Sequence, residues 1–458
     1  MSLEAALQNA NASIRELVES LIGTARVDVS ALPHGALDWT LAEAVAASAE
    51  QRLVVVTADL DEAYRHEANL RFLLGDPNGD VLVFAAADTS PLLEVVPDRR
   101  SEMQRMATLS RLAEDAAWRV LIVPASGLLR RVPPRTHVAE GLLSLAVGQR
   151  IERDALVEKL LTCGYQRVPL VEDRGTLSAR GALVDVFAPD GRLPCRIELD
   201  DDQITRIRHF DPEDQKTADE VGSVQLGPAR EVPDAVDAIA RAKSAVRELC
   251  DEMNMPTLEA REISVELDRG SGALISNALL PGYFDRLDTM FDYVPSDARV
   301  VLADPTGIAE SVQRELRHAR EEHGARAGRP TFGLDSYYVD EDELADRLAE
   351  HPALVAHRLT VHGAPGEDEG PIARAYAPSE EVLRVGATDQ QPLIASLRAQ
   401  KGHAERGLQP LADQIDEWTE AGLRVTLVGR TQHQADRLVD LLRSYGVERG
   451  VLESVALG

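Results

Sequence analysis

Short apolar runs alternate with helical stretches through the first 125 residues of the chain. The strand-like runs lie at residues 53–57, 81–84 and 120–123. Helical periodicity lies around and between them, at residues 3–21, 41–48, 60–74 and 102–116. Strands that are buried on both faces read as continuous apolar runs, and helices connect them when they are parallel. The pattern therefore predicts an α/β domain built on a parallel sheet.

The pattern changes after Pro133 and Pro134. Residues 153–162 read as a helix, and strand-like runs then follow one another closely, at residues 177–188, 195–199 and 204–210. Short turns between strands are typical of antiparallel pairing. We therefore predict a small α+β domain at residues 128–214, inserted into the first domain.

Helices and strands alternate again in the second half of the chain. A helix at 235–253, a strand at 299–303 and a helix at 308–322 predict that residues 215–350 complete the interrupted α/β domain. Residues 363–371 read as a linker or surface loop, rich in Gly and Pro. The remaining elements are a helix at 392–421, a strand at 423–428 and a helix at 432–445. They predict a small further α/β domain at residues 351–458.

The chain is strongly acidic, with 77 Asp and Glu residues against 49 Lys and Arg residues and a formal net charge of −28. Proteins that bind nucleic acids or anionic membranes usually present a basic face. The charge balance therefore argues against a nucleic acid or a membrane as the main partner.

The three cysteines lie far apart, at Cys163, Cys195 and Cys250. Their spacing supports neither a disulfide framework nor a zinc site. No run of residues approaches the ~18 apolar residues of a membrane span, and the first 23 residues lack the apolar core of a signal peptide. These features favour a reducing, cytoplasmic location.

Nucleotide hydrolysis needs residues that the sequence lacks. A P-loop combines a glycine-rich turn, a Lys directly after its last Gly, and a Ser or Thr for the metal. No lysine follows a Gly in this chain, whose lysines are Lys159, Lys216, Lys243 and Lys401. Residues 32–39 (LPHGALDW), in the expected place for the loop, contain one Gly and an Asp that would repel phosphate. We therefore predict that this chain does not hydrolyse ATP.

Other catalytic signatures are missing as well. The sequence contains no dinucleotide-binding G-x-G-x-x-G, no G-x-S-x-G elbow and no H-E-x-x-H zinc motif. The acidic run at residues 340–343 precedes leucines at helical spacing, so it predicts the first turn of a helix rather than a metal site. We predict no catalytic residues, no cofactor and no bound metal.

Residues 164–232 contain a series of short sequence motifs at specific spacings. The segments are 164–168 (GYQRV), 171–173 (VED), 179–187 (ARGALVDVF), 194–199 (PCRIEL), 207–217 (IRHFDPEDQKT) and 226–232 (LGPAREV). This series resembles domain 2 of the UvrB-like front end of the bacterial transcription-repair coupling factors (Mfd). A weaker likeness continues through residues 120–133, 280–284, 291–295 and 423–445.

The resemblance implies a domain 1a without a P-loop at 1–127, domain 2 at 128–214, domain 1b at 215–350 and domain 3 at 351–458. It implies a non-catalytic module that recruits the damage-recognition ATPase UvrA to stalled transcription in nucleotide excision repair. The family's RNA polymerase-interacting domain, its motor domains and its C-terminal domain would lie beyond Gly458. DNA and RNA polymerase would then be partners only through those missing domains.

In this family domain 2 is the surface that binds UvrA, and Arg and aromatic side chains are common at energetic hot spots. On this basis the candidate contact residues are Arg180, Arg167, Phe187 and Arg196. Two structural alternatives stay open: Arg180 could pair with Asp185 or Glu198 to hold the sheet, and Phe187 could belong to the core. Gly164, Gly181 and Asp185 are expected to be scaffolding.

Two other functions also stay open. The chain could be a UvrB-like remnant that binds nucleic acid, although its acidic balance argues against this. It could also regulate a larger translocase from within, if the missing C-terminal domain covers domain 2. The second alternative is compatible with UvrA binding.

Overall fold

The computed structural model describes residues 14–19, 21, 26–30, 32, 34–48, 50–75, 79–85, 89–93, 95, 98–114, 118–268, 277–358, 370–384, 391–400, 407–422, 425–429, 431–447 and 452–456. Of the helix predicted at residues 3–21, the described residues 14–19 and 21 are helical. Residues 3–13 lie outside the described residues, as do residues 363–369 of the predicted loop.

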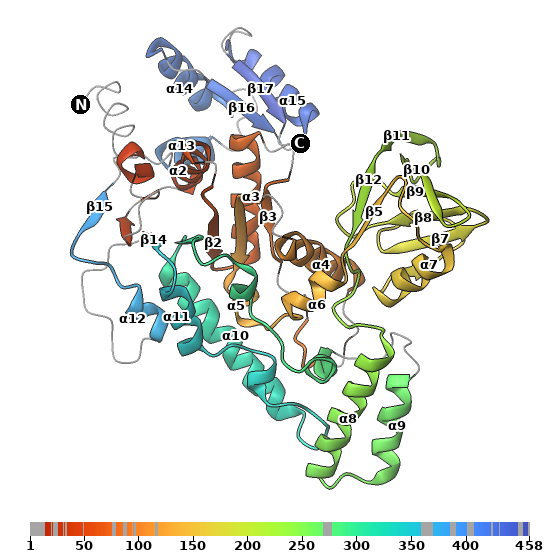
Figure 1. Cartoon of the computed structure of the whole chain (residues 1–458). Helices are drawn as coiled ribbons and strands as arrows, with labels where there is room; N and C mark the ends of the chain where they lie inside the picture. The colour runs from red at the N-terminus through yellow and green to blue at the C-terminus, as the bar shows by residue number, and fades with distance from the viewer. Residues whose placement is uncertain are drawn as a thin grey trace.

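A seven-stranded parallel sheet forms the centre of the chain (Figure 1). In spatial order its strands are β15 (Val382–Arg384), β1 (Val27–Ser30), β14 (Ala353–His357), β13 (Arg299–Leu302), β2 (Leu53–Thr57), β4 (Val120–Pro124) and β3 (Val81–Val83). Every neighbouring pair in this order is parallel. The predicted α/β class is therefore confirmed, and strands from both halves of the chain share one sheet.

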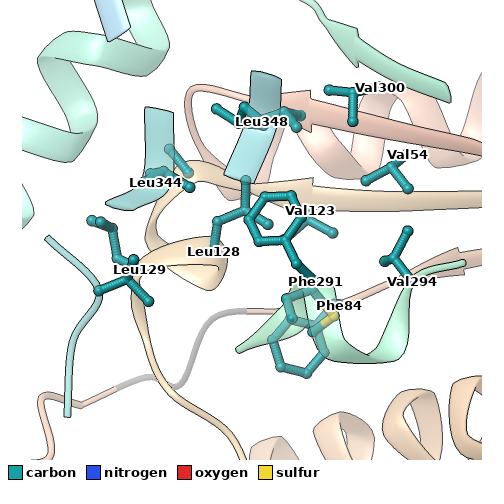
Figure 2. Close-up of a cluster of buried hydrophobic side chains, with 14 of the residues drawn as sticks. Val54, Phe84, Val123, Leu128, Leu129, Phe291, Val294, Val300, Leu344 and Leu348 are labelled. Atoms are coloured by element: carbon teal, nitrogen blue, oxygen red, sulfur yellow. The ribbon is translucent and has the colours of Figure 1, made fainter. Parts of the chain in front are cut away.

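Apolar side chains bury both faces of this sheet. One face packs against α2 (His34–Ala47) and α3 (Leu60–Leu74). The other packs against α4 (Arg99–Ala113), α5 (Ala125–Leu129), α10 (Pro305–Ala325) and α11 (Glu341–Ala349). Figure 2 shows part of this second core, where Val54, Val123 and Val300 of three strands face Leu128 of α5 and Leu344 of α11. Alternate residues of each strand therefore enter different cores.

Local capping explains why two helices begin where the sequence predicts. The side chain of Asp59 accepts the N–H of Glu62 at the start of α3, and Gly75 ends that helix in the left-handed region. The acidic run at 340–343 is the start of α11, where the Asp340 side chain accepts the N–H of Glu343. The helix predicted at 41–48 is part of α2, but its predicted start was wrong, because α2 begins at His34 and includes residues predicted to form a turn.

An antiparallel sheet lies to one side of the parallel sheet (Figure 1). Its strands, in spatial order, are β11 (Thr217–Val221), β10 (Gln203–Phe210), β9 (Cys195–Asp200), β8 (Leu183–Phe187), β7 (Thr176–Arg180) and β6 (Gln166–Arg167). The short β6 pairs in parallel with β7, and the other pairs are antiparallel as predicted. The helix α7 (Arg153–Thr162) covers one face, and β5 (Leu143–Ala146) pairs with β12 (Ser223–Leu226) beside the sheet.

A helical region follows the antiparallel sheet and carries its own apolar core. It contains α8 (Val236–Glu252), α9 (Thr257–Asp268) and the short helix η1 (Asn277–Tyr283). Four further short helices lie elsewhere in the chain: α6 (Arg135–Glu140), η2 (Met290–Tyr293), η3 (Leu334–Ser336) and α12 (Pro371–Ala375).

The last part of the chain forms a small α/β unit that is shorter than the one predicted at residues 351–458, because β14 and β15 belong to the parallel sheet. Its parallel strands β16 (Val425–Gly429) and β17 (Leu452–Ala456) flank α15 (Gln432–Arg443) in the sequence. The single helix predicted at 392–421 was wrong, because α13 (Gln391–Ala399) and α14 (Gln409–Glu420) are separate helices. Pro410 lies in the first turn of α14, where a missing N–H is tolerated. Among the described helices, none combines the length and hydrophobicity that a bilayer span requires.

Candidate partner-binding site

The strand register of the antiparallel sheet determines which side chains share a face. Residues paired across neighbouring strands point to the same side. Leu177, Val184 and Ile197 point into the core under α7. The opposite side, here called the outer face, carries Thr176, Ser178, Arg180, Leu183, Asp185, Phe187, Arg196, Glu198, Arg206 and Arg208. Three of the four predicted contact residues therefore lie on one face.

Arg180 is exposed at the end of β7, and Gly181 forms the tight turn to β8 with a φ of 56°. The Nε of Arg180 donates to Ser178 Oγ at 3.3 Å, and the Nη2 of Arg180 donates to the carbonyl of Pro169 at 2.5 Å. These bonds fix the guanidinium, yet no carboxylate pairs with it among the described residues. Arg180 thus presents an oriented and unneutralised positive charge.

The two carboxylates considered as partners of Arg180 belong to other arginines. Arg196 Nε and Nη2 donate to the two oxygens of Asp185 at 2.8 and 2.9 Å, and its guanidinium lies 4.6 Å from the ring centroid of Phe210. The hydrogen bond from Asp185 raises the pKa of Arg196. Arg208 is hydrogen-bonded to Glu198. The structure therefore does not contain the alternative in which Arg180 holds the sheet through Asp185 or Glu198.

Phe187 lies on the outer face, but its neighbours cover it. It is 6 % exposed and clusters with Val171 and Phe210. The guanidinium of Arg174 lies 5.8 Å from its ring centroid. Packing is thus the role that the structure shows for this ring.

Arg167 is exposed, but it does not lie on the outer face. In β6 it pairs with Leu177, whose side chain points into the core. It therefore lies at the sheet edge, on the side opposite to Arg180.

The sequence did not lead us to predict the exposed apolar residues next to Arg180 as part of the site. Leu183 pairs directly with Arg180 and is 36 % exposed, and Leu170 is 39 % exposed beside the carbonyl that holds the guanidinium. The hairpin that places Leu183 beside Arg180 was missed, because residues 177–188 were treated as one strand-like run. Recognising Gly181 as a hairpin turn would have placed Leu183 opposite Arg180.

The carboxyl ends of parallel strands are where nucleotides bind in related folds, and here the ends of β13 and β14 carry an ion-pair cluster. Among the described residues, β1 ends at Ser30 and α2 begins at His34, which leaves fewer positions between them than a P-loop needs. Arg358 is hydrogen-bonded to Glu62 and lies 3.3 Å from Asp304, which caps α10. This arrangement fits the prediction that the chain does not hydrolyse ATP, which stays a prediction. No group of His, Cys, Asp or Glu in the described parts of the chain is arranged to hold a metal.

Comparison with known proteins agrees with the resemblance of this region. Residues 143–232 match the family model of the UvrB interaction domain, a range that runs from β5 through β12. The transcription-repair-coupling factor of Myxococcus xanthus is 31 % identical over 444 residues, which cover 94 % of this chain and 35 % of that protein. The chain is a homologue of the transcription-repair coupling factors.

Two further relatives extend this finding. The factor of Escherichia coli K12 is 27 % identical over 453 residues, covering 93 % of this chain and 37 % of that protein. The factor of Bacillus subtilis 168 is 22 % identical over 426 residues, covering 90 % and 34 %. The chain spans about a third of the length of these relatives, and it matches their N-terminal third.

Proposed function

We propose that this chain is a non-catalytic adaptor that binds UvrA through the outer face and so brings it to stalled transcription for nucleotide excision repair. The observation that carries the proposal is Arg180, whose guanidinium is oriented but unpaired on a face within the matched interaction domain. An Arg beside exposed apolar side chains has the composition of an interface hot spot. The division into four domains is part of the same proposal, with two of the predicted boundaries moved. β11 and β12 extend the interaction domain beyond residue 214, and β14 and β15 extend the parallel-sheet domain beyond residue 350.

The predicted contact residues take different roles in this proposal. Arg180 contacts the partner directly, with Leu183 and Leu170 excluding water around it. Arg196 contacts the partner from the same face, and its ion pair with Asp185 fixes the orientation of its guanidinium. Phe187 supports the face from beneath, and Arg167 adds positive charge at the edge. The partner is therefore expected to present a carboxylate with apolar neighbours, because Arg pairs with carboxylates in a planar, bidentate geometry.

Replacing Arg180 by glutamate should weaken the complex with UvrA by about 30-fold or more, the size expected for a hot-spot residue. The wild-type complex should also weaken as salt rises, since charge pairs at an interface rim are screened. Binding of purified UvrA to the whole chain can be measured by titration calorimetry at two salt concentrations.

A matched control is the same change at Arg150. This residue is exposed, lies just before α7, and has one loose ion pair of 3.7 Å with Asp202. Arg150→Glu should leave binding nearly unchanged. Unchanged binding by Arg180→Glu would rule out the site, and no binding of UvrA by the wild-type chain would rule out the function.

A further inference from the structure

A second site lies away from the outer face, in a groove of about 980 Å³. It runs between α6 and α7 on one side and α8 and the segment 283–288 on the other. Its lining residues come from the interaction domain and from the helical region that follows it, so the groove lies where the two meet. Its volume is in the range of pockets that hold small ligands or short peptides.

Three hydrogen-bond donors that line this groove have no partner within the described residues. The side chain of Tyr283 is fully buried, and its hydroxyl makes no hydrogen bond. Arg230 is half-buried and Lys159 is exposed, and neither forms a hydrogen bond or an ion pair within the described residues. The charge of Arg230 also acts on the buried carboxyl of Glu102, but no hydrogen bond joins the two side chains. A buried polar group without a partner is costly, so a hydroxyl in this state points to a ligand or a bound water.

The donors also have suitable chemistry for an anion. Burial raises the pKa of Tyr283 to about 12, so the phenol stays protonated and can donate. The aliphatic part of Arg230 packs over Gly164, where an added Cβ would lie 2.6 Å from the Arg230 Cγ. Gly164 thus leaves the space that Arg230 needs to lie in the groove.

The rest of the lining limits which anion fits. Pro134, Pro228 and Phe284 supply an apolar wall. Glu140, Glu158 and Asp237 lie on the rim and are exposed, so they would repel a polyanion such as a nucleic acid. The other arginines of the groove already have acidic neighbours, since Arg241 lies 3.3 Å from Asp285 and Arg286 lies 3.7 Å from Asp288.

We propose that this groove binds a short peptide segment through one carboxylate, which Arg230, Lys159 and the Tyr283 hydroxyl receive, while apolar neighbours of that carboxylate pack on the proline and phenylalanine wall. The site is separate from Arg180 and does not rest on UvrA binding. Its occupant is a protein segment with a single Asp or Glu among apolar residues.

The test uses the immobilised whole chain and two pools of pentapeptides. One pool has glutamate at the centre and the other glutamine, with Ala, Val, Leu or Phe at the remaining positions, and every peptide is amidated at its C-terminus so that the glutamate supplies the only carboxylate. Retained peptide is measured by mass spectrometry. Wild type should retain the glutamate pool about tenfold over the glutamine pool, the effect of charge-assisted hydrogen bonds in a partly buried site.

Arg230→Gln keeps the methylenes over Gly164 and should remove most of this preference. Tyr283→Phe keeps the ring and should reduce the preference several-fold. Arg317→Gln removes an exposed charge from α10, which does not line the groove, and should change nothing. Equal retention of the two pools by wild type overturns the proposal, as does a preserved preference in Arg230→Gln. If Arg230→Gln does not fold, as judged by its circular dichroism, an unchanged preference in Tyr283→Phe overturns it instead.

Discussion

Replacing Arg105 by methionine should lower the free energy of unfolding by about 3–5 kcal/mol, the cost of leaving one partner of a buried ion pair alone. Arg105 of α4 is 2 % exposed, and its Nε donates to Glu231 Oε1 at 2.5 Å. Its Nη1 donates to the carbonyl of Ala85 at 3.2 Å, and its guanidinium lies 4.7 Å from the ring centroid of Phe84. Methionine fills similar space, so the loss would come from the unpaired Glu231 carboxylate.

The double variant Arg105→Met with Glu231→Leu should recover much of that stability, because replacing both charges by apolar groups leaves none unpaired. Arg206→Met is the matched control, since its pair with Glu220, at 3.4 Å, is exposed and should contribute less than about 1 kcal/mol. Stability can be measured by urea unfolding followed by circular dichroism, fitted with separate transitions where the domains unfold separately. A cost below that of the control, or a double variant as unstable as the single one, would contradict the argument.

This ion pair also matters for how the interaction domain is held. Glu231 is the second-last residue of the matched domain, and its N–H donates to a carboxylate oxygen of Glu102 of α4 at 2.9 Å. Arg99, one turn earlier in α4, donates to the carbonyl of Gly175 at 2.7 Å. A single helix of the parallel-sheet domain, α4, thus forms hydrogen bonds with two segments of the interaction domain. Since Arg180 is not among these contacts, Arg105→Met should loosen the junction without removing the proposed UvrA site.

The sequence predicts those elements whose signals are local. The strand Leu53–Thr57 and the helices Leu60–Leu74 and Arg153–Thr162 have their predicted bounds, because apolar runs, caps and periodicity act within a few residues. The strands Val27–Ser30 and Ala353–His357 were not predicted. They are short, and they become strands by pairing with each other across more than 300 residues of chain.

The candidate site divides in the same way. Arg180 could be chosen from the sequence, because it lies in a recognised series of residues and Arg is common at interface hot spots. The face of the sheet on which each side chain lies could not be predicted from the sequence, because shifting a strand by one residue moves every side chain to the other face. The register separates Arg167 from Arg180, and it assigns Asp185 to Arg196. The groove residues Arg230 and Tyr283 come together only in the tertiary structure, so no local pattern could link them.

The second large effect is expected at Asp28, on β1, where Asp28→Ala should cost about 3–5 kcal/mol. Asp28 is 3 % exposed, and His357 Nε2 lies 2.7 Å from its Oδ1. Arg26 donates to both of its oxygens at 2.9 Å and also to the carbonyls of Ala375 and Ala377 at 2.7 and 2.8 Å. The carboxylate therefore links β1 to the end of β14 and, through Arg26, to the segment after α12.

The pH dependence of this effect has a definite sign. Burial acts to raise the pKa of Asp28, but hydrogen bonds from His357 and Arg26 and the charge of Arg26 outweigh it, so the pKa lies below its ordinary value of 3.8. The folded state thus favours the ionised form, and its contribution is complete above the unfolded pKa and lost as the pH falls through the lower folded value. The stability difference between wild type and Asp28→Asn should be constant above about pH 5 and shrink below pH 3.8. The exposed change Asp416→Asn, which removes the same charge from α14, should show no such window. A difference that grows as the pH falls would mean that Asp28 is not held as a carboxylate, and that Arg26 and His357 stabilise β1 in another way.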